Sequence, residues 1–332
     1  MTNAQTRTTG SRSGGAGGFT LLEVLLATAV VSILLVLLLF TITQTSTIWR
    51  RSMGQIESFQ EARMVYEVIT RNLSQATLNT YLDYDNPNDA RRYLRKSELK
   101  FMIGKADGTG LGTVGTGQQI FFQAPLGYVN NTISYGGLEA LLNTCGYYVS
   151  FSRDAAIPAH VSQTNNPYRY RLMQMLVPSE SNTIYKTTGV PDAWYSAFAT
   201  EAQPVANNII ALIIRPQDPA TLISAPSSPP NNSYTYDSTA SALADPQPVT
   251  ANQLPPVVQV TMVAIDDASA KRLDSGASEP KAITDALAGK FSDNPAAFET
   301  EMAQLVRALE DARINYRIFS SAVPMREAKW TK

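Results

Sequence analysis

The feature that most limits how this chain can fold is an unbroken apolar run near its N-terminus. Residues 19–40 read FTLLEVLLATAVVSILLVLLLF, in which Glu23 is the only charged residue. As a helix the run would span roughly 33 Å, close to the ~30 Å hydrocarbon thickness of a bilayer. A buried helix in a soluble protein would carry a polar face over such a length. We therefore expect residues 19–40 to be a transmembrane helix.

A short polar segment precedes this run. Residues 1–18 are rich in Thr, Ser and Gly and carry Arg7 and Arg12 but no acid. An ordinary secretory signal peptide is the main alternative, but its apolar region covers only about 7–15 residues and ends in a small-residue cleavage site. Here the apolar run is longer, no such site follows it at 41–49, and glycines lie at its beginning instead. These features argue against an ordinary signal peptide.

Glu23 is the residue that interrupts the apolar run. A carboxylate in hydrocarbon costs a few kcal/mol, so an acid at this place is a candidate functional residue. One interpretation is that Glu23 reaches the nearby headgroups. The other is that it pairs with a positive group, such as a new amine at Phe19, about 6 Å away along the helix, if the chain is cut after Gly18.

Residues 18–24, GFTLLEV, resemble the N-terminal signal of type IV prepilins and pseudopilins. The resemblance implies that a prepilin peptidase cleaves between Gly18 and Phe19 and methylates the amine of Phe19. It implies that Glu23 pairs with the amine of a neighbouring subunit during assembly. Its further implied partners are other pilin or pseudopilin subunits and an inner-membrane assembly platform with its ATPase.

The same resemblance implies a single pass through the inner membrane. The leader 1–18 would be cytoplasmic, and the C-terminal domain would be periplasmic or extracellular within a filament. Charge alone does not decide this orientation, because Arg7 and Arg12 on one side are matched by Arg50 and Arg51 on the other.

The helix is expected to continue beyond the membrane as an amphipathic half over residues 41–79. Between residues 42 and 78 there is no proline, and Gly54 is the only glycine. Apolar residues recur there in steps of three and four, which is typical of one helical face: Trp49, Met53, Ile56, Phe59, Ala62, Val65 or Tyr66, Ile69, Leu73 and Ala76. We expect this face to pack on a sheet and the helix to end between residues 79 and 88.

Residues 80–332 are expected to form a β-rich globular domain. Strands are predicted at 99–103, 120–123, 147–151, 168–177, 209–215, 257–265 and 314–319. Loops are predicted at 104–118, 178–192 and 216–253, the last being too polar to pack. An insertion at 274–311 is predicted to be helical from 278, with Ser278 and Asn294 as N-caps, Pro295 at the first helical position, and Phe298, Met302, Leu305, Val306 and Leu309 on one face.

These elements predict an α+β, pilin-like fold, in which a long N-terminal helix packs on an antiparallel sheet with loop and helical insertions. A second resemblance agrees with this fold. The order of segments 168–180, 205–216 and 254–266 is similar to that of J-type minor pseudopilins of type II secretion. Segments 76–88, 120–128, 136–144, 171–180 and 253–266 resemble the Verru_Chthon cassette protein C group, a prepilin-type family without an assigned activity.

Few residues favour catalysis or a cofactor. Residues 110–115 fit G-x-G-x-x-G, but a strand rather than a helix is predicted after them, so no dinucleotide site is expected. His160 is the only histidine, which leaves no set for zinc or a catalytic triad. Asp83, Asp85 and Asp89, and Asp266 with Asp267, are interpreted as solvated turn residues rather than a calcium site. We expect no cofactor and no metal.

Three further observations bear on function. Cys145 is the only cysteine, which excludes an intramolecular disulfide and predicts a small buried residue. A net charge of −1 gives no electrostatic footprint for nucleic acid. Aromatic residues that could serve an interface, or could equally cap the core, are Tyr128, Tyr135, Trp194, Tyr195, Tyr234 and Tyr236.

The sequence therefore predicts a minor pilin or pseudopilin, a structural subunit rather than an enzyme. The alternative is a single-pass anchored binding protein or adhesin that never polymerises. A membrane-tethered enzyme is a third hypothesis, which would require acids converging in a deep pocket.

Overall fold

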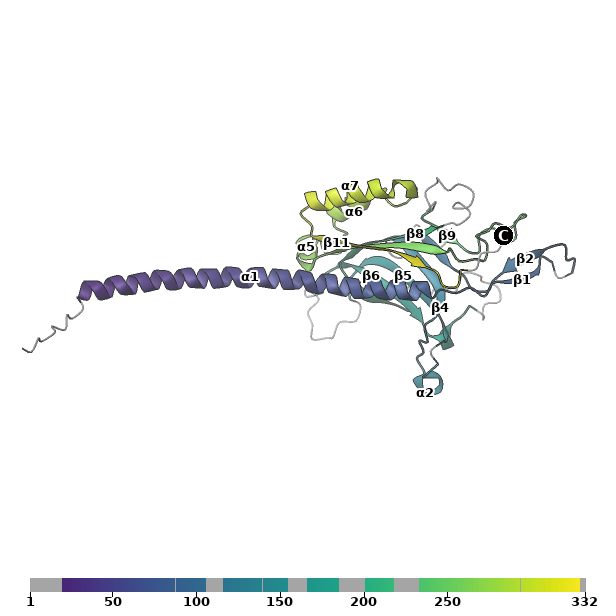
Figure 1. Ribbon diagram of the computed structural model, residues 1–332, viewed down its shortest axis with the longest axis horizontal. Helices are drawn as coiled ribbons and strands as arrows, with labels where there is room; N and C mark the ends of the chain where they lie inside the picture. Colours follow the sequence, from purple (N-terminus) through teal and green to yellow (C-terminus); the bar gives the residue numbers. More distant parts are fainter. Residues whose placement is uncertain are drawn as a thin grey trace, which may run out of the picture. The chain divides into compact units, whose positions relative to one another are not determined.

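The computed structural model describes residues 20–86, 88–105, 116–138, 140–154, 166–184, 201–217, 233–292 and 294–328. Two compact units divide the chain between Met53 and Gly54. Helix α1 (Leu21–Ser74) begins in the first unit and ends in the second (Figure 1). The predicted cleavage residues Gly18 and Phe19 lie outside the described residues, as do the side chains of Met53 and Ile56.

In the first unit, α1 is apolar on every side from Val24 to Phe40. Its sequence favours a helix because it is rich in leucine and alanine and contains neither glycine nor proline up to Gly54. None of its side chains in the apolar stretch Leu21–Ser46 is buried against the rest of the chain. Among the described residues, this helix alone is long and apolar enough to cross a membrane.

In the second unit, α1 is amphipathic as predicted. Ala62, Tyr66, Ile69 and Leu73 are buried, in steps of four, three and four residues. The helix ends at Ser74, five residues before its predicted end. The N–H of Ala76 donates to the carbonyl of Leu73 at 3.0 Å, and the next N–H, of Thr77, donates to a strand residue. The sheet therefore takes over the backbone hydrogen bonds at this point.

Two antiparallel sheets form the body of the second unit. The larger has the order β7-β6-β5-β4-β3-β9, and the smaller has the order β11-β10-β8. The larger consists of β3 (Met102–Lys105), β4 (Thr116–Pro125), β5 (Leu142–Ser152), β6 (Arg169–Val177), β7 (Ala202–Asn207) and β9 (Tyr236–Asp237). The smaller consists of β8 (Ile209–Gln217), β10 (Val257–Ile265) and β11 (Tyr316–Pro324). A separate hairpin joins β1 (Tyr81–Tyr84) to β2 (Tyr93–Lys96).

The α+β class predicted from the sequence is confirmed, and each predicted strand overlaps an observed one. The last strand begins at Tyr316 rather than at residue 314 and runs on to Pro324. Strands β1, β2, β7 and β9 were not predicted. Edge strand β7 contains Pro204, which is tolerated because β7 pairs only with β6 among the described strands.

The last turns of α1 bond to both sheets. The hydroxyl of Tyr66 donates to the carbonyl of Val260 on β10 at 2.9 Å and lies 2.8 Å from the Ser321 hydroxyl on β11. Six residues later, the side-chain amide of Asn72 donates to the hydroxyl of Tyr147 on β5 at 2.9 Å. The helix therefore contributes buried contacts to each sheet.

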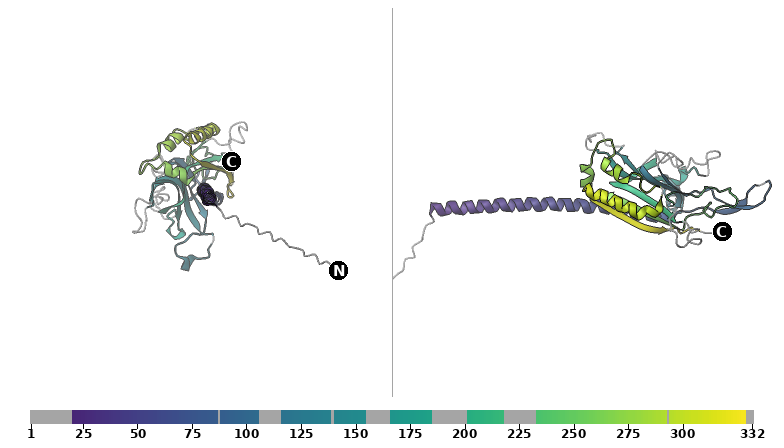
Figure 2. Two further views of the ribbon diagram at one scale, coloured as in Figure 1. Left: turned by 90° about the vertical axis from the view of Figure 1, so that its left-hand side faces the viewer. Right: turned by 90° about the horizontal axis from the view of Figure 1, so that it is seen from above.

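Helices in the predicted insertion cover one side of this body (Figures 1 and 2). They are α6 (Lys281–Leu287), a 3-10 turn at Pro295–Ala297 and α7 (Phe298–Asp311). As predicted, Asn294 caps the second helical segment, since its side chain accepts from the N–H of Ala296 at 3.1 Å. The prediction that Ser278 is an N-cap is wrong, because α6 begins at Lys281 and Pro280 occupies the N-cap position. Proline has no side-chain oxygen that could accept a hydrogen bond from the N–H groups of the first turn.

Two further expectations are corrected. Asp266 is not a solvated turn residue: it is buried and caps the unpredicted helix α5 (Asp267–Arg272). Its carboxylate accepts from the N–H of Ser269 at 2.9 Å and from the Asn315 side chain at 3.0 Å, which offsets the cost of burying it.

The predicted loop 216–253 is also partly wrong. Its described part, 233–253, packs well and contributes β9, because its tyrosines are buried and their hydroxyls are paired. The Tyr236 hydroxyl donates to the carbonyl of Gln253 at 2.7 Å. Tyr234 and Tyr236 therefore belong to the core and are not interface residues, whereas Trp194 and Tyr195 lie outside the described residues.

Candidate functional site

Glu23 lies in the first turn of α1, where it forms a capping box with Thr20. The backbone N–H of Glu23 donates to the Thr20 hydroxyl oxygen at 3.3 Å. In return, one carboxylate oxygen of Glu23 accepts from the N–H of Thr20 at 3.0 Å and from its hydroxyl at 3.2 Å. Each side chain thus satisfies a donor that the start of a helix would leave unpaired.

The Thr-x-x-Glu spacing that produces this box is visible in the sequence at Thr20 and Glu23. The sequence-based interpretation considered Glu23 only as an acid in the membrane and did not include the capping box. The box supplies a local reason for a carboxylate here, since the N-terminus of a helix also carries partial positive charge. It uses one of the two carboxylate oxygens of Glu23 in the hydrogen bonds above. The other oxygen has lone pairs available for a further donor.

Glu23 is the only charged residue between Phe19 and Trp49. The nearest basic residues in sequence are Arg12 on one side and Arg50 on the other. No side chain of α1 within several turns can neutralise the carboxylate. A cation that does so would have to come from outside this stretch of the helix.

Hydroxyl side chains further along the apolar stretch are satisfied within the helix. The hydroxyls of Ser32, Thr41 and Thr45 each donate to the carbonyl four residues earlier at 2.8 Å. Such bonds remove the cost of an unpaired polar group in an apolar solvent. Glu23 is the only charged side chain in the stretch 21–46, and no side chain of opposite charge lies in that stretch to balance it.

The other acids considered from the sequence are held by local partners. Asp83 pairs with Lys96 at 2.7 Å, and this neighbouring ammonium keeps the pKa of Asp83 below its usual range. Asp85 accepts from backbone N–H groups of the hairpin loop, and Asp89 pairs with Arg91. Gly110–Gly115 and His160 lie outside the described residues.

Cys145 is fully buried, as predicted, and burial raises the pKa of its thiol to about 12. The side-chain amide of Gln174 approaches its sulfur at 3.9 Å. A thiol in this state is almost wholly protonated at neutral pH, and the thiolate is the nucleophilic form. Cys145 is therefore a core residue and not a nucleophile.

The hairpin β1–β2 and the segment that ends in α2 project from the body (Figure 1), and both carry exposed apolar side chains. In the hairpin β1–β2, the side chain of Leu82 is 68% exposed and that of Tyr93 is 62% exposed. The rings of Tyr93 and Tyr84 stack with their centroids 4.7 Å apart. The second projection ends in α2 (Thr132–Tyr135), where Ile133 is 98% exposed.

The second projection also holds Tyr128 and Tyr135, both exposed as the sequence suggested. Its base is fixed because the Glu180 carboxylate accepts from the N–H groups of Asn130 and Asn131 at 2.7 and 2.8 Å. Exposed aromatic and aliphatic groups on a fixed support are typical of protein contact surfaces.

No protein-family model, curated protein or solved structure matches this chain.

Proposed function

We propose that this chain is a membrane-anchored subunit of a type IV pilin-like filament, made as a precursor and cleaved between Gly18 and Phe19. The observation that carries the proposal is the single carboxylate of Glu23 at the start of the apolar stretch Leu21–Ser46. A helix that is apolar on every side is stable inside a bilayer or a bundle of similar helices. An uncompensated acid in such a place calls for a partner of opposite charge.

Cleavage after Gly18 would create that partner. The new amine at Phe19 would sit one residue before Thr20, whose N–H and hydroxyl already bind one oxygen of Glu23. The other oxygen of Glu23 is then free to accept from the amine of a neighbouring subunit. Such an ion pair in hydrocarbon forms strongly because solvent does not screen it.

The proposed path follows from this pairing and from the resemblance to prepilins. The leader 1–18 stays in the cytoplasm, prepilin peptidase cuts and methylates the chain at Phe19, and the assembly platform with its ATPase adds the subunit to a helical bundle. The body, from Gly54 onward, lies in the periplasm or outside the cell and contacts other subunits. Its role in this proposal is structural and not catalytic.

Processing is tested by sequencing the N-terminus of the protein purified from its own cells. The proposal expects Phe19 as the first residue, carrying a methylated amine, and expects Gly18→Leu to leave the precursor uncut. An N-terminus at any other position, or full processing of Gly18→Leu, would overturn it.

The role of Glu23 is tested by two variants that separate its charge from its capping bond. Glu23→Gln removes the charge and keeps an acceptor at the third helical position, where glutamine also completes a capping box. Thr20→Val keeps the charge and removes the hydroxyl of the box. The proposal expects Glu23→Gln to abolish incorporation into filaments sheared from the cells, whereas Thr20→Val retains it.

The opposite result, in which Thr20→Val fails and Glu23→Gln assembles normally, would show that Glu23 serves only to cap the helix. Both variants are first checked for equal amounts in the membrane fraction. This control is needed because a loss of insertion or stability would mimic a loss of assembly.

A second candidate is an anchored binding protein that does not polymerise. The exposed Leu82, Tyr84 and Tyr93 on the β1–β2 hairpin favour it, since such a surface suits a partner protein. Under this alternative Glu23→Gln leaves function unchanged, while Tyr93→Ser on the hairpin removes it. The two variants therefore give opposite outcomes for the two candidates.

A further inference from the structure

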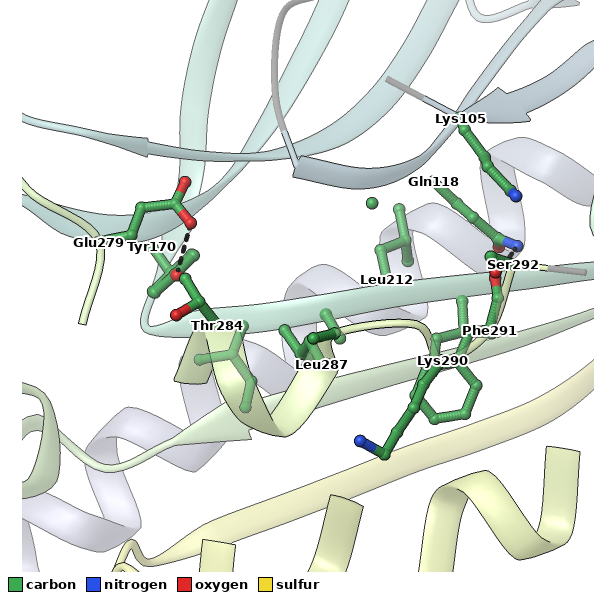
Figure 3. Close-up of a pocket in the computed structure, with 15 residues that line it drawn as sticks. Lys105, Gln118, Tyr170, Leu212, Glu279, Thr284, Leu287, Lys290, Phe291 and Ser292 are labelled. Atoms are coloured by element: carbon green, nitrogen blue, oxygen red, sulfur yellow. Dashed lines mark hydrogen bonds between the residues drawn. The ribbon is translucent and has the colours of Figure 1, made fainter. Parts of the chain in front are cut away.

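A cavity of about 370 Å³ lies in the second unit, between the outer edge of β8 and the helix α6 (Figure 3). Four consecutive residues of β8, Ile210–Ile213, line it. Successive side chains of a strand point to opposite faces of its sheet, so four in a row can border one cavity only along the strand's backbone edge. The cavity therefore adjoins main-chain groups and not only side chains.

The direction of these main-chain groups follows from one hydrogen bond. The N–H of Ile214 donates to the side-chain carbonyl of Gln118 and thus points away from β10. In an antiparallel ladder this direction alternates, so the N–H and C=O of Leu212 point the same way. Pro216 shares this alternation, which is why its missing N–H does no harm to the pairing with β10.

Leu212 is only 3% exposed and borders the cavity. Among the described strands β8 pairs only with β10, so the outward N–H and C=O of Leu212 lie outside that ladder. Buried main-chain groups are nearly always paired, with protein, water or a ligand. A strand edge with an inward-facing donor and acceptor is the element to which extended peptides add as an extra strand.

The two ends of the cavity differ in charge. At one end the Tyr170 hydroxyl donates to the carboxylate of Glu279 at 3.1 Å, and at the other lie Gln118 and Lys105 (Figure 3). Between them the lining is mostly apolar and includes Leu212 and Leu287, with Thr284 and Lys290 as polar members. The acidic end adjoins the start of β8, because the Tyr170 carbonyl accepts from the N–H of Asn208 at 2.7 Å.

We propose that this cavity binds a short extended peptide, which pairs through its backbone with Leu212 and places its free amino group at Glu279. The length fits, since residues 210–214 of a strand cover about 13 Å and three peptide residues cover about 10 Å. The volume lies at the lower end of small-ligand sites, which span roughly 300–1,000 Å³. The apolar middle selects an aliphatic central side chain.

The test titrates the full chain in detergent with the tripeptide Ala-Leu-Ala and follows binding by calorimetry. One saturable site is expected. Methylating the two backbone amides of the peptide removes the strand-like donors, and acetylating its amino group removes the charge that Glu279 recognises. Each change is expected to weaken binding at least tenfold, or about 1.4 kcal/mol.

Two protein variants accompany the peptides. Ala288→Trp fills the cavity from its exposed rim and is expected to abolish binding, whereas Ala303→Trp on the exposed face of α7 leaves binding unchanged. Glu279→Gln is expected to remove the difference between the free and the acetylated peptide. Equal melting temperatures establish that the variants are folded.

Absence of binding at millimolar peptide overturns the proposal, and so does equal binding of the methylated and unmethylated peptides. Equal binding by wild type and Ala288→Trp would place the peptide elsewhere and refute the assignment. None of these outcomes depends on cleavage at Gly18 or on filament assembly.

Discussion

Replacing Tyr147 with phenylalanine is expected to destabilise the body by about 1–3 kcal/mol. The ring stays, so packing is unchanged, and only the hydroxyl is lost. That hydroxyl accepts from the Asn72 side chain on α1 at 2.9 Å and from the Gln174 side chain at 2.8 Å. Gln174 is half-buried and can turn to water, but Asn72 is 8% exposed and is left with a buried unpaired donor.

The complementary change is Asn72→Leu. It leaves the Tyr147 hydroxyl with its bond to Gln174, and we expect a loss of about 1 kcal/mol. In the double variant both partners of the buried bond become apolar, a replacement that is often close to neutral. The double variant is therefore expected to be more stable than Tyr147→Phe alone.

The assay is urea unfolding of the detergent-solubilised full chain, followed by circular dichroism. The midpoints should shift while the slope with urea stays constant, which reports a change in stability and not in the unfolded state. Tyr316→Phe is the matched control, because its exposed hydroxyl bonds to Glu310 at 3.1 Å and should change stability by less than about 0.5 kcal/mol. If the double variant loses the sum of the two single losses, the helix and the sheet are not coupled through this bond.

Three further predictions concern single residues. Because burial raises the pKa of Cys145 to about 12, its thiolate is scarce below that pH, and iodoacetamide at pH 8 should label it only after unfolding; labelling of the folded protein would contradict this. Gly146→Ala should cost about 1–3 kcal/mol in a thermal melt, since its Cβ would lie 2.3 Å from the buried ring of Phe121; an unchanged melt would refute the clash. Asp266→Ala should cost about 1–2 kcal/mol through loss of the cap to Ser269, whereas Asp266→Asn, which still caps, should cost less; equal losses would show that capping is not the cause.

Much of the fold could be predicted because its signals are local. Strands β8 and β10 are continuous, almost wholly buried apolar runs, and such runs stand out in the sequence. The buried face of α1 repeats in steps of three and four from Ala62 to Leu73. These patterns require no knowledge of what lies opposite.

The elements that escaped prediction depend on distant partners. The polar strand β7 forms because β6 offers it an edge, and nothing in AQPVAN indicates that edge. Tyr234 and Tyr236 stand in a segment rich in Ser, Asn and Pro, and both are buried against distant partners. The Tyr236 hydroxyl donates to the carbonyls of Thr250 and Gln253, and the Tyr234 hydroxyl donates to the carboxylate of Glu301. Local composition therefore gave the wrong answer there.

The candidate sites show the same division. Glu23 was found from the sequence because a lone acid in an apolar run is conspicuous, although its bond to Thr20 was overlooked. The cavity beside β8 had no linear signal, since Tyr170, Leu212 and Glu279 come from three separate segments. Only the fold brings a strand edge, a hydroxyl and a carboxylate to one place.

The buried turns of α1 have a practical consequence for dissecting this protein. The end of helix α1 and the start of the folded body do not coincide. Tyr66 and Asn72 are residues of the helix, and their side chains bond within the interior of the body. A truncation that removes residues 1–53 takes away the apolar stretch Leu21–Ser46 and leaves the second unit whole. The shortened protein should dissolve without detergent. A truncation that removes the chain up to Leu73 would also remove Tyr66 and Asn72. The two sheets would then lose the helix that bonds to both of them.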